Sequence, residues 1–135
     1  MEKAENITQC RLGIWKTYHN AFIDLEVRQW LRRPIVPENC QHNAHMFYLI
    51  MRSHPEQLGL LKQLKANGIN AVFHYVPLHS SDAGRRYGRI GSSMQQTEDL
   101  ANRLIRLPLY PDLTEDELKK TCQTIKQYYE NITNV

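Results

Sequence analysis

Residues 45–75 read HMFYLIMRSHPEQLGLLKQLKANGINAVFHY, and this stretch decides the fold. Its first part, 45–51, is short, aromatic and branched, which predicts a buried strand. Residues 53–56 (SHPE) predict the start of a helix, because proline is favoured at the first helical positions and an acid in the first turn. Gly68 suits a left-handed helix end, and residues 69–75 predict a second strand. The buried stripe of the helix is expected at Leu58, Leu61 and Leu64.

Upstream of this unit, residues 2–30 predict a long amphipathic helix. Its apolar side chains recur with gaps of 7, 4, 4 and 3 residues, which places them on one helical face: Ile7, Ile14, Tyr18, Phe22 and Leu25. Pro34 and Pro37 end the pattern, because proline cannot continue a helix.

Downstream, residues 77–93 are rich in glycine, proline, serine and arginine and predict a long loop that is functional or mobile. A helix is expected at 97–107, a short extended piece at 107–111, and a last helix opened by the capping box 114–117. This order indicates an α+β fold, with a small two- to three-stranded sheet, helices packed mainly on one face, and the long helix in front. We expect residues 1–135 to form a single domain.

Composition excludes several classes of protein. The 135 residues are 41% hydrophobic and 23% charged, as in ordinary globular domains. The net charge of +3 is too small for a nucleic-acid-binding face, so no nucleic-acid partner is expected. The longest apolar run, residues 46–51, is too short to span a membrane. No apolar signal opens the sequence and the three cysteines lack CxxC spacing, so we expect a cytoplasmic protein with free thiols at Cys10, Cys40 and Cys122.

Residues 40–45 (CQHNAH) gather three potential metal ligands, Cys40, His42 and His45. A structural zinc site needs four closing ligands, and the sequence offers no second cluster, so we expect no metal. In the alternative interpretation Cys40 is buried and both histidines are ordinary loop or strand-edge residues. The sequence assigns no role to any of the three.

Residues 73–79 (FHYVPLH) place two histidines and a tyrosine at the end of the second strand, where proteins often present chemical groups. Strict alternation puts Phe73 and Tyr75 on one face of the strand and His74 on the other. A neutral imidazole at that point could serve in a site or could be a core histidine bonded to a backbone carbonyl. The residues alone leave both interpretations of His74 open.

A cluster of arginines lies in the predicted loop. Arg85, Arg86 and Arg89, together with Tyr87 and glycines, indicate a flexible cationic segment. Forked guanidinium bonds could grip a phosphate or carboxylate there, although a solvated loop is an equally simple alternative. The spacing of its glycines is not followed by Lys and then Ser or Thr, so this is not a nucleotide-binding P-loop.

Three ordered segments carry a resemblance to a known family: NAHMFYLIM (43–51), GINAVFHYVPLHSSDAGRRYGR (68–89) and TEDLANRLIRLPLYPDLTEDE (97–117). The chain resembles the C-terminal small domain of sugar-nucleotide aminotransferases, which are pyridoxal-phosphate enzymes of fold type I. It looks most like the TDP-4-keto-6-deoxy-D-glucose aminotransferases, which supply 4-amino-4,6-dideoxy sugars for the biosynthesis of lipopolysaccharide or enterobacterial common antigen. One departure is Asp82, where the family commonly has proline.

The resemblance implies a reaction and a set of site residues. An intact enzyme of this kind moves an amino group from glutamate to the C4 ketone of a TDP-4-keto-6-deoxy-hexose. His74 then holds the position of the family histidine that approaches the cofactor, with Tyr75 and His79 on the substrate side. Three further residues lie where the family loop reaches toward the nucleotide-sugar: Arg85, Arg86 and Tyr87.

The resemblance also implies a missing part. The family's large domain normally supplies the Schiff-base lysine and the acid that holds the cofactor ring. All seven lysines of this sequence fall in predicted helices of mixed charge, so we expect no catalytic residue and no bound pyridoxal phosphate in this chain alone. Without the large domain, the first helix and the strand-end face would expose apolar surface. That surface should drive self-association, as a homodimer or a larger oligomer. The alternative is a non-catalytic nucleotide-sugar or protein-binding module from a truncated gene.

Overall fold

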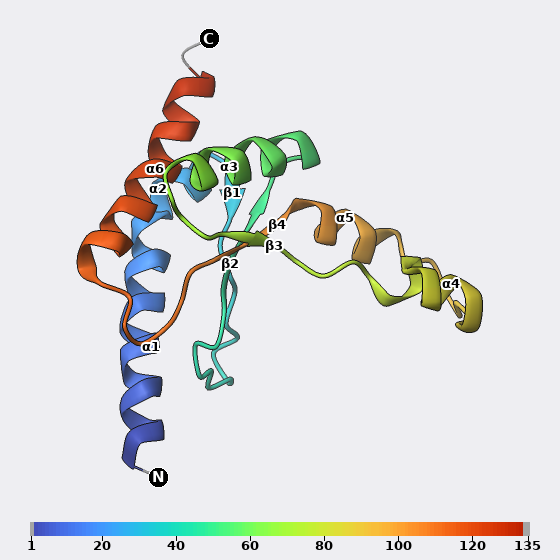
Figure 1. Cartoon of the computed structure of the whole chain (residues 1–135), viewed down its shortest axis with the longest axis horizontal. Coiled ribbons are helices and arrows are strands. Elements are labelled where there is room, and N and C mark those ends of the chain that lie inside the picture. Colours follow the sequence, from blue (N-terminus) through green and yellow to red (C-terminus); the bar gives the residue numbers. More distant parts are fainter. Residues whose placement is uncertain (1, 134–135) are drawn as a thin grey trace.

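The computed structural model describes residues 2–133. Figure 1 shows a small central sheet, helices gathered on one side of it, and a helical segment that extends from the other side. We refer to this segment, residues 78–103, as the arm. The elements follow in this order: α1 (Glu2–Ala21), α2 (Ile23–Val27), β1 (Leu31–Arg32), β2 (Phe47–Met51), α3 (His54–Ala66), β3 (Val72–Phe73), the 3-10 turn η1 (Leu78–Ser80), α4 (Asp82–Tyr87), α5 (Gln95–Arg103), β4 (Leu104–Leu107) and α6 (Glu115–Thr133).

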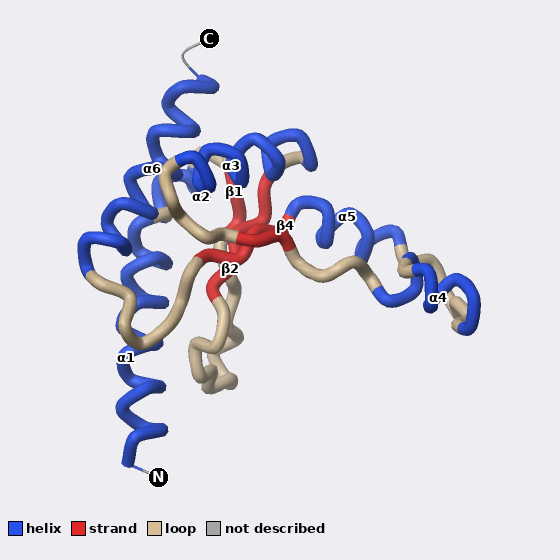
Figure 2. Tube along the Cα trace, viewed as in Figure 1, coloured by secondary structure: helices blue, strands red, loops and turns tan. Residues whose placement is uncertain are grey.

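The predicted α+β class is confirmed, with a sheet larger than the expected two or three strands. Four antiparallel strands lie in the order β1-β2-β4-β3 (Figure 2). Two of them, β1 and β3, are only two residues long and form the edges. The longest pairing joins β2 to β4, where Phe47 lies opposite Leu107 and Leu49 opposite Ile105. Paired residues of an antiparallel sheet share a face, so these four side chains point to the same side.

That side of the sheet carries the core. Phe47 and Ile105 are fully buried under aromatic and aliphatic side chains from three helices. Tyr18 of α1 lies with its ring centroid 5.1 Å from that of Phe47. Leu60 and Leu64 of α3 and Ile125 and Tyr129 of α6 complete the cluster. The prediction that helices pack mainly on one face therefore agrees with the structure.

The long N-terminal helix is interrupted, which corrects the prediction of one helix over residues 2–30. α1 ends at Ala21, and Phe22 separates it from the short α2 with a backbone ψ of 13°. Gln29, at a left-handed φ of 59°, then turns the chain toward β1. The buried stripe begins at Ile14 rather than Ile7, because Ile7 lies on the part of α1 that extends beyond the core and is exposed.

The helix predicted at 97–107 is shorter and ends at Arg103, because the next four residues pair with both β2 and β3 to form β4. The short extended piece therefore lies at 104–107 and not at 107–111. The strand predicted at 69–75 shrinks to β3, since the amide of Ala71 donates to Ile69 O in a tight turn.

The buried stripe of α3 differs from the prediction at two positions, because Leu58 is exposed and Leu61 is only half-buried. Leu64 is buried as predicted, together with Gln57 and Leu60. Gln57 tolerates burial because its side-chain amide donates to Leu104 O at 2.9 Å.

The predicted start and end of α3 and the predicted start of α6 are confirmed. Ser53 Oγ accepts a hydrogen bond from the amide of Glu56, and Gly68 has the left-handed φ of 75°. At the start of α6, Thr114 Oγ1 accepts from the amide of Glu117 at 3.2 Å, and the Glu117 carboxylate accepts from the amide of Thr114 at 2.9 Å. This reciprocal pair is a capping box.

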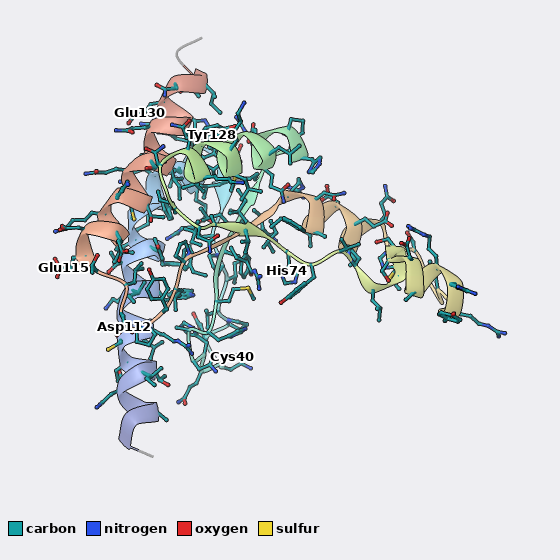
Figure 3. All side chains as sticks on the ribbon, viewed as in Figure 1. Cys40, His74, Asp112, Glu115, Tyr128 and Glu130 are labelled. Carbon is teal, nitrogen blue, oxygen red and sulfur yellow. The ribbon has the colours of Figure 1, made fainter. Side chains whose placement is uncertain are left out.

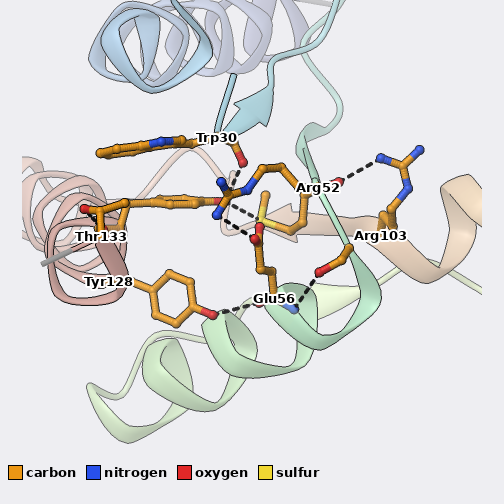
Figure 4. Close-up of polar contacts among 9 residues, drawn as sticks. Trp30, Arg52, Glu56, Arg103, Tyr128 and Thr133 are labelled. Atoms are coloured by element: carbon orange, nitrogen blue, oxygen red, sulfur yellow. Dashed lines mark hydrogen bonds and ion pairs between the residues drawn. The ribbon is translucent and has the colours of Figure 1, made fainter. Parts of the chain in front are cut away.

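A polar network joins α6 to α3 and to the strands (Figure 4). The Tyr129 hydroxyl donates to Trp30 O at 3.0 Å and also contacts Met51 Sδ at 3.1 Å. Tyr128 reaches the carbonyl of Glu56 at 3.3 Å, and Arg52 forms an ion pair with the Glu56 carboxylate at 2.6 Å. Burial raises the pKa of Tyr129 far above its usual value. The network fixes the C-terminal helix against the sheet.

A second polar cluster holds the interruption between α1 and α2. Arg33 forms an ion pair with Glu26 at 2.6 Å and donates to His19 Nδ1 at 3.1 Å. Because guanidinium nitrogens only donate, Nδ1 must accept, which requires the neutral imidazole with its proton on Nε2. Burial and the Arg33 charge both lower the pKa of His19. Burial opposes ionisation of Glu26, but hydrogen bonds from Arg33 outweigh it and lower the pKa of that carboxyl.

This cluster predicts a loss of stability in mild acid. The folded-state pKa of His19 lies below its ordinary value of 6.5, so the unfolded chain binds its proton first. The contribution of neutral His19 to the free energy of unfolding is complete above about pH 6.5. It is lost as the pH falls from there toward the folded-state pKa of His19. Urea unfolding at several pH values between 8 and 5 should show this slope. The variant His19→Gln should flatten it, and an unchanged slope in the variant would contradict the assignment.

Candidate functional site

His74 follows β3 directly, at the point where the chain leaves the sheet toward the arm (Figure 3). It lines a cavity of about 290 Å³ between the end of β3, the first turns of α3 and the end of α5. Phe73, Tyr75 and Pro77 contribute from its own segment, and His54, Leu61 and Asn102 contribute from the two helices. The cavity is formed mainly by apolar side chains, as ligand sites usually are.

The imidazole of His74 has an unsatisfied nitrogen. Its Nδ1 is buried, and no hydrogen-bond partner for it lies among residues 2–133. The interpretation of His74 as a core histidine bonded to a backbone carbonyl is therefore wrong for this atom. Buried polar atoms are almost always paired, so an orphan of this kind calls for a partner from outside the chain.

Tyr75 is the predicted substrate-side residue that the structure places beside His74. The two ring centroids are 5.6 Å apart, and 72% of Tyr75 is exposed. Its ring also lies 5.1 Å from the guanidinium carbon of Arg106. Tyr75 lines the cavity together with Phe73. Because β3 ends at Phe73, strict alternation of faces applies only up to that residue.

His79 lies further along the arm, in η1. Its Nε2 is 3.1 Å from the Glu98 carboxylate of α5, and the two groups form an ion pair whenever the ring is protonated. His79 does not line the cavity beside His74. The structure therefore assigns His79 a contact within the arm and does not bring it to the candidate site.

The three loop residues predicted to reach a nucleotide-sugar lie at the end of the arm. The predicted loop at 77–93 is partly helical here, since it contains η1 and α4. Arg85 is already bound to Asp82 at 2.6 Å and to the carbonyl oxygen of Ser80. Arg86 lies 5.2 Å from the ring of its neighbour Tyr87. All of these side chains are exposed and distant from the His74 cavity along the arm.

One glycine fixes the tight packing of this arm. A Cβ at Gly84 would overlap the carbonyl oxygen of Leu78, so α4 can fold back on η1 only without a side chain there. Ser81 caps α4 by accepting from the Gly84 amide at 3.0 Å. The glycine that looked like a source of flexibility is thus needed for close approach.

Large apolar side chains are exposed from the end of β3 along the arm. Six of them are more than half exposed: Phe73, Tyr75, Val76, Leu78, Tyr87 and Ile90. Several exposed apolar side chains along one segment of a small domain are typical of an interaction surface. We refer to these six residues as the arm surface.

The residues predicted as possible metal ligands lie elsewhere, in the loop between β1 and β2 (Figure 3). Cys40 is exposed, so the alternative in which it is buried is wrong. The ring of His42 packs 4.5 Å from that of Trp15, and His45 bonds to Asn43. Within residues 2–133, no group of three His, Cys, Asp or Glu side chains is close enough to hold a metal ion.

No lysine with a described side chain lines the His74 cavity. Five of the six are exposed, and Lys126 of α6 is half-buried in another part of the molecule. Among the helices of residues 2–133, none is both long and apolar enough to cross a membrane.

Two residues near the site were missed by the sequence analysis. Arg106 falls in the segment predicted as the end of a helix. Only the strand register pairs it with Val72 and so brings it near Tyr75. His54 was read as part of a helix start, yet its ring bonds to Asn102 O at 2.8 Å and forms a wall of the cavity. A period-2 reading of residues 104–107 (LIRL) is the signal that could have found Arg106.

Comparison with known proteins gives the family. The model described as "DegT/DnrJ/EryC1/StrS aminotransferase family" matches residues 1–126. The chain is similar to the dTDP-3-amino-3,4,6-trideoxy-alpha-D-glucose transaminase of Micromonospora megalomicea subsp. nigra. The two are 25% identical over 120 residues, which cover 87% of this chain and 31% of the relative.

Solved structures share the fold. The aminotransferase TlmJ from Streptoalloteichus hindustanus superimposes with a TM-score of 0.83 at 21% identity, over 98% of this chain and 34% of that one. The PLP-form of the putative sugar aminotransferase Spr1654 from Streptococcus pneumoniae gives a TM-score of 0.75 at 22% identity, over 93% and 32% of the two chains.

These matches cover nearly all of this chain but a smaller part of the relatives. The chain spans about a third of the length of the curated relatives that it matches. The His74 cavity, the four-stranded sheet and the arm thus correspond to a part of a larger aminotransferase fold. Because the family model matches residues 1–126, the chain belongs to the DegT/DnrJ/EryC1/StrS aminotransferase family.

Proposed function

We propose that this chain is the C-terminal small domain of a pyridoxal-phosphate-dependent sugar-nucleotide aminotransferase. The observation that carries the proposal is the buried, unpartnered Nδ1 of His74 in a domain whose residues 1–126 match the family. In the proposed reaction, glutamate gives its amino group to the C4 ketone of a TDP-4-keto-6-deoxy-hexose. The name of the similar Micromonospora transaminase contains a dTDP-linked amino sugar, which supports a nucleotide-sugar substrate.

The residues present fit one wall of a pyridoxal phosphate site. His74 offers a nitrogen without a partner at the edge of an apolar cavity of about 290 Å³. When bound, the cofactor supplies an electron sink for the transfer of the amino group. The lysine and the acid that hold it come from the large domain in this proposal, because no described lysine lies at the cavity.

The chain's own residues position and shield the reacting groups. His74 Nδ1 donates or accepts toward a group of the cofactor or substrate, according to its tautomer. Phe73 and Tyr75, both largely exposed in this chain, cover that group and exclude water from it. His54 stays in place through its bond to Asn102 O and keeps the cavity open at the start of α3.

The experiment compares the full-length enzyme with a version that ends before residue 1 of this chain. Both are loaded with pyridoxal phosphate, and release of 2-oxoglutarate from glutamate is followed with the keto sugar nucleotide present. We expect turnover from the full-length enzyme only. Equal turnover by the shortened version would contradict the proposed role of this domain.

We also propose that the isolated chain self-associates through the arm surface. Leu78 is 80% exposed and Tyr87 is 77% exposed, and burying such side chains is favourable by about 25 cal/mol per Å² of apolar area. Static light scattering of the purified chain should give a mass above that of a monomer. The double substitution Leu78→Ser and Tyr87→Ser should return it to the monomer mass, and a strictly monomeric wild type would contradict the proposal.

A further inference from the structure

The face of the sheet opposite the core carries a row of three paired residues. Tyr48 of β2 lies opposite Arg106 of β4, and Arg106 lies opposite Val72 of β3. All three share one face, because cross-strand partners in an antiparallel sheet point to the same side. Tyr48 and Arg106 are half-buried and Val72 is exposed, in contrast to the fully buried core on the other face. Arg106 therefore stands at the centre of the less covered face.

Arg106 has no anionic partner within residues 2–133. Four other arginines each form an ion pair with a carboxylate: Arg33, Arg52, Arg85 and Arg103. Arg106 takes part in no such pair, and its Nε is buried without a hydrogen-bond partner. A guanidinium that is partly withdrawn from water and lacks an acceptor is unusual, because its desolvation is not offset.

Tyr75 is the aromatic neighbour of this guanidinium. Its ring lies 5.1 Å from the guanidinium carbon of Arg106. A cation–π contact of this kind takes up none of the guanidinium N–H donors in a conventional hydrogen bond, so they remain to be paired. The same ring lies 5.6 Å from that of His74. Two unsatisfied buried nitrogens, His74 Nδ1 and Arg106 Nε, thus flank one tyrosine.

We propose that Arg106 and Tyr75 form an oxyanion-binding site beside His74, which receives an acidic group of the substrate. This inference rests on the proposed function for the identity of the substrate. Its ligand chemistry is a carboxylate or a phosphate, since both present two oxygens that match the guanidinium fork. The amino donor glutamate supplies the first, and the nucleotide of the sugar substrate supplies the second.

The arginines of the arm are poorer candidates for this task. Arg85 is already neutralised by Asp82, and Arg86 is exposed beside Tyr87 at the end of the arm. An anion binding there would have to displace an existing carboxylate or bind in full contact with water. Arg106 combines partial burial, an unpaired donor and contact with Tyr75, whose ring lies beside that of His74.

The test is an NMR titration of the full 135-residue chain, labelled with ¹⁵N so that the arginine Nε–H signals are resolved. Glutamate and thymidine diphosphate are added separately at constant ionic strength, with thymidine as the uncharged control. We expect a saturable shift of the Arg106 Nε–H signal with at least one of the two anions and none with thymidine. The ligand that saturates identifies the source of the oxyanion. Absence of saturation with both overturns the proposal.

Variants separate a site from general charge attraction. Arg106→Gln should weaken binding of that anion at least tenfold, and Arg106→Lys, which keeps the charge but lacks the fork, should weaken it several-fold. Arg28→Gln is the matched control, because Arg28 also lies over an aromatic ring, 5.0 Å from that of Trp30. It should leave the affinity unchanged. Equal weakening by Arg106→Gln and Arg28→Gln overturns the site, and the lysine variant decides the matter if the glutamine variant does not fold.

The same variants distinguish this inference from the proposed function. A full-length enzyme that transaminates normally with Arg106→Gln overturns the oxyanion site and leaves the aminotransferase proposal standing. Saturable binding of an anion at Arg106 in a protein whose full-length form does not transaminate supports the site and contradicts the proposed function.

Discussion

Substituting alanine for His74 in the full-length enzyme is expected to lower kcat by about 100-fold, the size of effect that follows when a reacting group loses its positioning contact. His74 Nδ1 is buried and has no partner among residues 2–133, and in the proposed function it bonds to the cofactor or the substrate. Steady-state kinetics should show the loss mainly in kcat, with a smaller change in KM. The absorption spectrum of the bound cofactor should shift in the same variant, because a contact to it is removed.

His45→Ala is the control for this prediction. His45 is exposed, and its hydrogen bonds are to Asn43 in the loop before β2, away from the cavity. We expect its turnover to match that of the wild type. Unchanged turnover in His74→Ala would remove His74 from the site.

Substituting alanine for Phe47 is expected to lower the free energy of unfolding by about 3–5 kcal/mol, the usual range for removal of a buried phenylalanine. Phe47 is fully buried at the start of β2, and its ring contacts Tyr18, Phe22 and Trp15. Trp15 and Tyr18 are held in α1 and Phe22 lies at the break that follows it, so these rings cannot all close on the cavity that the substitution leaves. Urea unfolding followed by circular dichroism measures the change.

Phe73→Ala is the matched control, because it is the same substitution in a strand that pairs with the same partner. Phe73 lies opposite Ile105 of β4, as Phe47 lies opposite Leu107. It is 58% exposed, so the expected loss of stability is about 1 kcal/mol or less. Equal losses in the two variants would show that Phe47 is not at the centre of the core.

The parts of the fold that were predicted correctly depend on local signals. Ser53, Gly68 and the Thr114–Glu117 box lie where helix ends need a side-chain oxygen, a left-handed residue and a reciprocal cap. β2 was found because five consecutive apolar residues fit a buried strand. Each of these requires only neighbours in the sequence.

The errors in the fold arise where tertiary pairing overrides local preference. Residues 104–107 continue a helical pattern in the sequence, but their backbone groups bond to β2 and β3 and so form a central strand. β1 is two residues long and exists only as a partner of Met51 and Ile50. No local signal marks so short a strand.

The candidate site was predictable only in part, for a similar reason. His74 and Tyr75 were named from a motif, and the structure places them side by side. His79 and Arg85 have partners within the arm, Glu98 and Asp82, which spacing in the sequence does not reveal. Arg106 became a candidate only once the register of β4 was known.

Product analysis with the full-length enzyme tests the proposed aminotransferase activity most directly. Glutamate labelled with ¹⁵N and TDP-4-keto-6-deoxy-D-glucose are incubated with the pyridoxal-phosphate-loaded enzyme, and the sugar nucleotides are separated for mass spectrometry. We expect a TDP-linked 4-amino-4,6-dideoxy sugar that carries the label, in an amount equal to the 2-oxoglutarate released and strongly reduced in His74→Ala. A loaded enzyme that transfers no label to this or any other keto sugar nucleotide would contradict the proposed activity.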